Sequence, residues 1–144
     1  MMDEVLEIVD RTLNRQDLRE FMVNEKGYHF MGTRSVRGMK MDPYNRETLV
    51  EGAIGYTVYF QGEDSPLVFI DVTVNPLHSA ADQAAEHLAK NAFDSVPGGA
   101  ENSTLYFLGI YALDNKRVLK IMLLEERTSG RVSDINLRYG LSRK

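Results

Sequence analysis

The stretch LVEGAIGYTVYF-QGEDSP-LVFIDVTV, residues 49–74, decides the expected fold. In its first and last parts, alternate positions are apolar and predict one buried face of a strand: Ile54, Tyr56, Val58 and Phe60, then Val68, Ile70, Val72 and Val74. The intervening residues 61–66 are polar and contain Gly62 and Pro66, which is typical of a turn. Two alternating runs joined by a turn predict an antiparallel hairpin with one face against a core.

Upstream of this hairpin, residues 3–24 have helical spacing and begin with acidic residues, which the helix dipole favours in a first turn. The spacing falters between Asn14 and Asp17, so either one helix or two with a bend fits, and Gly27 is the expected stop. Residues 36–41 fit a strand, and the sequence DPYN at 42–45 predicts a turn.

Downstream, Ser79 and Asp82 form a capping-box pattern that predicts a second helix, which the sequence PGG at 97–99 ends. Its apolar stripe comprises Ala81, Ala84, Ala85, Leu88, Ala92 and Phe93. Residues 104–113 and 118–124 are apolar on both faces, which is typical of central strands. Residues 135–141 alternate as an amphipathic strand, with turns expected at 114–116 and 128–130.

The expected order of elements is therefore α-β-β-β-α-β-β-β. We expect a single α+β domain over residues 1–144, with a mainly antiparallel, twisted sheet and the helices packed on one face. The length of 144 residues suits one domain. The absence of cysteine excludes disulfides, thiolate zinc sites and cysteine nucleophiles. No secretory leader or membrane-spanning run is recognisable, so we expect a cytoplasmic protein without a membrane partner.

The net charge of −4 is unevenly distributed. Residues 26–46 and 127–144 each sum to +4, and residues 47–126 between them sum to −8. The first basic segment interleaves cations with aromatic residues, and its candidate nucleic-acid contacts are Lys26, Tyr28, Phe30, Arg34, Arg37, Lys40 and Arg46. Cations neutralise phosphates and aromatic rings stack on bases. The alternative is solvated charge on loops and edge strands that prevents aggregation.

Common catalytic signatures are absent: the sequence has no phosphate-binding loop, no dinucleotide fingerprint, no nucleophile elbow and no zinc-helix motif. We therefore expect no cofactor and no metal. Asp71 interrupts an apolar run and has two interpretations. In the first it lies on the solvent face of an amphipathic strand with Thr73 and Asn75. In the second it is a metal-binding carboxylate at the edge of a cleft.

The segments EGAIG at 51–55 and LVFIDVT at 67–73, followed by a predicted helix, resemble the core of restriction-endonuclease-like, or PD-(D/E)XK, nucleases. The upstream segments KGYHF at 26–30 and RSVR at 34–37 resemble the part after that family's first helix. The resemblance implies an α-β-β-β-α-β core. Gly55 stands where the family has a metal-binding aspartate, with Glu51 as the nearest acid, and Thr73 replaces the lysine after Asp71. The resemblance therefore implies a degenerate, inactive site.

Three functions remain open from the sequence. The first is a non-catalytic binding or assembly module whose partner is a second copy of itself or another protein. The second is a nucleic-acid-binding protein on a degenerate nuclease-like fold that uses residues 26–46. The third, and least favoured, is an active metal-dependent nuclease using Glu51 and Asp71.

Overall fold

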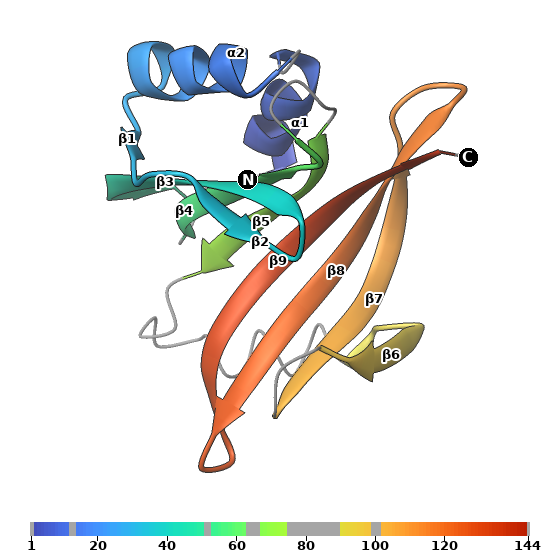
Figure 1. The fold of residues 1–144 in the computed structure, drawn as a ribbon. Coiled ribbons are helices and arrows are strands. Elements are labelled where there is room, and N and C mark those ends of the chain that lie inside the picture. The colour runs from blue at the N-terminus through green and yellow to red at the C-terminus, as the bar shows by residue number, and fades with distance from the viewer. Residues whose placement is uncertain are drawn as a thin grey trace. The chain divides into compact units, whose positions relative to one another are not determined.

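The computed structural model describes residues 2–11, 14–50, 53–62, 67–74, 90–98 and 102–143. These residues form mainly antiparallel β-structure, with two short helices at the N-terminal end (Figure 1). The chain divides into two compact units, Met1–Asp71 and Val72–Lys144, which are taken in turn. The expectation of one domain over residues 1–144 stays a prediction.

The first unit begins with α1 (Met2–Arg11) and α2 (Arg15–Glu20), and α2 runs on into a π-helical turn, η1 (Phe21–Glu25). Of the two alternatives left open near Asn14, the structure has two helices, and the Asn14 side chain caps α2 by accepting a hydrogen bond from the Asp17 backbone N–H at 2.9 Å. Gly27 follows the last turn with a φ of 77°, a conformation that glycine adopts without strain.

The strands of the first unit are β1 (His29–Phe30), β2 (Arg34–Val36), β3 (Met39–Val50), β4 (Ala53–Phe60) and β5 (Leu67–Val74), the last of which crosses the unit boundary. The long strand β3 is antiparallel to β1 and β2 on one side and to β4 on the other. β5 lies beside β4, as expected for the hairpin of residues 49–74, and the Tyr59 and Phe69 rings stack at 4.1 Å.

Three local predictions for this unit are wrong. The expected strand over 36–41 contains a turn, because Arg37 and Gly38 both have positive φ angles, 51° and 80°, as two-residue hairpin turns require. The expected turn at 42–45 is part of β3. The expected strand over 49–60 is divided, because β3 ends at Val50 and β4 begins at Ala53.

Pro43 explains why β3 can pass through a sequence that predicts a turn. Phe30 pairs with Tyr44 in the β1–β3 ladder, and Arg34 pairs with Met41 in the β2–β3 ladder. Pro43 therefore lies opposite the interruption between β1 and β2, where its missing N–H costs the ladder least. Its carbonyl still accepts a hydrogen bond from the Met31 N–H at 2.9 Å.

The core of the first unit lies between the helices and one face of β3 and β4. The predicted buried face of β4 is confirmed for Tyr56, Val58 and Phe60, each no more than 1% exposed, whereas the side chain of Ile54 lies outside the described residues. Buried residues of the helices complete this core: Val5, Ile8, Leu18 and Met22. Figure 1 shows both helices on the same side of β3 and β4.

The second unit contains β6 (Asp94–Pro97), β7 (Ser103–Ala112), β8 (Arg117–Thr128) and β9 (Arg131–Arg143), in the spatial order β6-β7-β8-β9. Every pair among them is antiparallel. The prediction that residues 104–113 and 118–124 form central strands is confirmed, because β7 and β8 each lie between two other strands. The turn at Ser129-Gly130 is also as predicted, with φ angles of 55° and 79°.

The expected order α-β-β-β-α-β-β-β is not the one observed. Both described α-helices precede all the strands, and β6 was not expected. Most of the helix predicted from Ser79 falls on residues 75–89, which lie outside the described residues. Its C-terminal end is wrong, because Asp94–Pro97 is a strand paired with Thr104–Phe107, and the Phe93 N–H donates to the Phe107 carbonyl at 3.0 Å.

Candidate functional site

Two cations of the basic segment are engaged in contacts within the first unit. The Lys26 ammonium lies 2.9 Å from a Glu7 carboxylate oxygen and 3.9 Å from Glu4. The Arg46 guanidinium lies over the Tyr28 ring, with its Cζ 4.9 Å from the ring centroid, and donates to the Tyr28 hydroxyl at 3.4 Å. Lys26 thus joins the end of η1 to α1, and Arg46 joins β3 to Tyr28, so neither cation stands free for a phosphate.

The two aromatic candidates for base stacking are also engaged. Tyr28 is buried, meets the Tyr56 ring edge-on and donates its hydroxyl to the Glu4 carboxylate. Burial raises the pKa of the Tyr28 phenol, and the bond to Glu4 raises it further. Phe30 is half-buried and has the guanidinium of Arg19 over its ring at 4.1 Å. Tyr28 is therefore shielded from a base, and Arg19 covers one face of the Phe30 ring.

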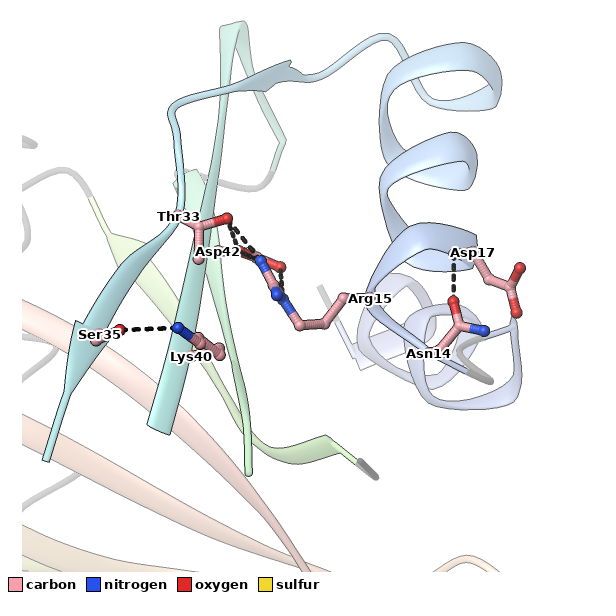
Figure 2. Close-up of polar contacts among 7 residues, drawn as sticks. All are labelled: Asn14, Arg15, Asp17, Thr33, Ser35, Lys40 and Asp42. Atoms are coloured by element: carbon pink, nitrogen blue, oxygen red, sulfur yellow. Dashed lines mark hydrogen bonds and ion pairs between the residues drawn. The ribbon is translucent and has the colours of Figure 1, made fainter. Parts of the chain in front are cut away.

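Arg34, Arg37 and Lys40 remain accessible on the β2–β3 hairpin. Arg34 and Arg37 are exposed, and the Lys40 ammonium donates to the Ser35 hydroxyl at 3.1 Å (Figure 2). In the part of the chain that the structure describes, no carboxylate pairs with any of the three. Of the seven candidate nucleic-acid contacts, these three cations on the β2–β3 hairpin are the ones that remain available to a phosphate.

The structure does not describe both of the carboxylates proposed for metal binding, so no such site can be drawn from it. Glu51 lies outside the described residues, and Asp71 lies on β5, only 6% exposed. The solvent-face interpretation of Asp71 is therefore wrong. Its neighbour Thr73 donates to the Asn136 side chain at 2.9 Å in the second unit. Among the described residues, no group of three or more histidines and carboxylates is placed to hold a metal ion.

A buried polar cluster in the first unit was missed by the sequence interpretation. Arg15 of α2 donates to both carboxylate oxygens of Asp42 on β3, and its Nη2 also donates to the Thr33 hydroxyl at 2.6 Å (Figure 2). Thr33 in turn donates to Asp42 Oδ1 at 2.7 Å. Asp42 was assigned to a turn, and Arg15 fell where the helical spacing falters, so no local signal linked them. The cluster is closed and structural.

The second unit carries an apolar surface that we call the β7 edge, defined by Phe93, Phe107 and residues 109–111. Phe93 is 67% exposed, Ile110 63% and Tyr111 41%. Beside them lies a groove of about 280 Å³, lined by Phe93, Asp94, Phe107, Gly109, Ile110 and Lys120. The Phe93 and Phe107 rings lie 6.1 Å apart. Large apolar side chains clustered on a surface are typical of an interaction site.

Among the residues that the structure describes, this edge is open because β6 is short. β6 covers β7 only from Thr104 to Phe107, whereas β7 continues to Ala112. Along residues 109–112, β8 is the only strand that the described chain pairs with β7. The sequence interpretation placed this segment in a central strand because it is apolar on both faces. The exposed edge could be found only once the length of β6 was known.

Comparison of the chain with protein-family models, with curated proteins and with solved structures finds no match. The resemblance to PD-(D/E)XK nucleases therefore stays a prediction. No helix in the described ranges is long and apolar enough to cross a membrane.

Proposed function

We propose that this protein is a non-catalytic assembly module that pairs with a second copy of itself through the β7 edge. The observation that carries the proposal is the exposure of Ile110, Tyr111 and Phe93 beside a strand edge that β6 leaves open. An exposed apolar strand edge offers backbone N–H and C=O groups together with side chains that gain by leaving water.

The partner is a second copy because the edge is its own complement. All the strand pairs of the second unit are antiparallel, and a two-fold axis through residues 109–112 would place the same segment antiparallel to itself. The groove beside it has one acidic and one basic wall residue, Asp94 and Lys120.

The size of the patch sets the expected affinity of the dimer. Four residues of strand edge with one groove would bury less than the roughly 1,200 Å² that marks the lower end of stable specific interfaces. We therefore expect a dimer whose population depends on protein concentration.

Sedimentation equilibrium of the full chain over a wide range of concentrations tests the proposal. We expect a mass rising toward twice 16.4 kDa for the natural sequence and a monomer for Ile110→Lys. Met31→Lys is the matched control, because Met31 is 54% exposed on the first unit and should leave the mass unchanged. Circular dichroism would establish that each variant is folded. A natural chain that stays monomeric, or an Ile110→Lys chain that dimerises equally, would refute the proposal.

Nucleic-acid binding on a nuclease-like fold is the second candidate, supported by the three hairpin cations Arg34, Arg37 and Lys40. Fluorescence anisotropy of labelled single- and double-stranded DNA at several salt concentrations tests it. If the hairpin binds phosphates, Arg34→Ala with Arg37→Ala should lower the slope of log K against log salt by about 2, whereas Lys90→Ala should not. No binding at low salt would remove this candidate. Cleavage with magnesium or manganese would revive the nuclease alternative.

A further inference from the structure

The turn between β7 and β8 and the end of β9 surround a cavity that the assembly proposal does not use. The cavity has a volume of about 760 Å³ and is lined by Asp114, Asn115, Lys116, Arg117 and Arg143. Three of these residues are cationic and one is anionic, so the described lining carries a net charge of +2. This concentration of positive charge is notable in a chain whose net charge is −4.

Asp114, the one carboxylate among the described lining residues, is fully committed to the turn. Asp114 Oδ1 accepts hydrogen bonds from the backbone N–H groups of Lys116 and Arg117, both at 2.8 Å. Asp114 Oδ2 accepts from Arg117 Nε at 3.0 Å. The Lys116 backbone bond, followed by the Arg117 side chain, holds the pKa of Asp114 below its usual value, so this carboxylate stays ionised and fixed.

The two arginines of the cavity face each other across the ladder. Arg117 and Arg143 are direct partners in the β8–β9 pair, so their side chains leave the same face of the sheet. Like charges directly opposite each other destabilise a strand pair. Asp114 offsets part of this repulsion through Arg117 Nε alone, which leaves the terminal nitrogens of Arg117 without an acceptor among the described residues. No described carboxylate approaches Arg143 or the Lys116 ammonium.

We propose that this cavity binds a small phosphate monoester. Two guanidinium forks on one face match the oxygens of a phosphate, and the Lys116 ammonium adds a third donor. A phosphate monoester carries a charge of about −1.5 to −2 at neutral pH, which balances the lining. The volume falls within the usual range of small-molecule sites and exceeds what a bare phosphate ion would fill. Binding would also relieve the repulsion between Arg117 and Arg143.

Isothermal titration of the full chain with glycerol 3-phosphate and, separately, inorganic phosphate tests the proposal. We expect both to bind the natural sequence, with the ester the tighter of the two. Arg143→Gln should weaken binding by about tenfold or more, because a hydrogen bond to a charged group is lost. Arg143→Lys keeps the positive charge but loses the planar guanidinium. Its affinity should therefore fall between that of the natural sequence and that of Arg143→Gln. Arg34→Gln is the matched control, since Arg34 is an exposed arginine of the first unit.

Dimethyl phosphate, a diester with one negative charge, separates a dianion site from general attraction to phosphates such as those of a nucleic-acid backbone. We expect it to bind at least tenfold more weakly than the monoester. Equal binding of diester and monoester, unchanged binding in Arg143→Gln, or no binding by either phosphate probe would overturn the proposal. Because Arg143 is exposed, circular dichroism should show the same fold in every variant, and the comparison then reports binding alone.

Discussion

The guanidinium of Arg15 donates two hydrogen bonds to the carboxylate of Asp42, from Nε to Oδ2 at 2.9 Å and from Nη2 to Oδ1 at 3.0 Å. The pair joins α2 to β3, and both side chains are almost completely shielded from water. Two charges withdrawn from water in this way are stable only while each satisfies the other.

We expect Asp42→Asn to lower the free energy of unfolding by about 3–5 kcal/mol, because it leaves the Arg15 charge buried without a counter-charge. Urea unfolding followed by circular dichroism measures the loss. Asp10→Asn, which removes an exposed carboxylate from α1, should change stability by less than about 0.5 kcal/mol. The double change Arg15→Met with Asp42→Leu should recover most of the loss. A small effect of Asp42→Asn would mean that the ion pair is solvated.

Gly55→Ala should destabilise the first unit by about 1–3 kcal/mol, the usual cost of overfilling a packed site. A Cβ at this position would lie 2.8 Å from the Tyr44 carbonyl oxygen and 2.6 Å from Asn45 Oδ1, and the backbone atom cannot easily move. Thermal unfolding measures the effect. Gly140→Ala is the control, because there the nearest atom is the flexible end of Met122 at 3.1 Å. Equal melting temperatures for both variants would contradict this account.

Arg37→Asn should stabilise the β2–β3 hairpin by a few tenths to about 1 kcal/mol. Arg37 has a φ of 51°, and asparagine followed by glycine is the preferred sequence for such a turn. Gly38→Ala should act in the opposite direction by about 1–2 kcal/mol, since the φ of Gly38 is 80°. The melting temperature should therefore rise for Arg37→Asn and fall for Gly38→Ala, relative to the natural sequence. A shift in the same direction for both would exclude this turn geometry.

Asp114 should contribute to stability above its ordinary pKa of 3.8 and lose that contribution as the pH falls through its lower pKa in the folded state. The sign follows because the folded protein binds this proton less readily than the unfolded chain. Asp114→Asn should therefore lower the melting temperature at pH 6 and have little effect near pH 2. Carboxyl NMR titration should place the Asp114 midpoint below 3.8. A midpoint at or above that value would contradict the turn contacts.

The sequence predicted those elements whose signals are local. The helix break at Asn14, the stop at Gly27 and the Ser129-Gly130 turn depend on residues that satisfy or bend the neighbouring backbone. The alternating apolar positions of β4 were sufficient to identify its buried face. In each case the residues that give the signal are the residues that form the structure.

The errors have a common cause in long-range pairing. The sequence DPYN at 42–45 favours a turn in isolation, yet Asp42 is held in a strand by Arg15, which lies 27 positions earlier in the sequence. The open edge of β7 depends on how far β6 extends, which no pattern in β7 reports. The Arg117–Arg143 pairing depends on the register of β8 against β9. Tertiary context of this kind overrides local preference.

The Arg15–Asp42 contact also has a consequence for how the chain avoids mispairing. Moving β3 by one residue against β2 and β4 would turn Asp42 to the opposite face and bring Pro43 out of the gap between β1 and β2. Such an arrangement would leave the Arg15 charge in an apolar environment without Asp42. It would also remove a hydrogen bond from the β-ladder at Pro43. Only one alignment satisfies both residues, so Asp42 and Pro43 together select the observed register of β3 over one shifted by a single residue.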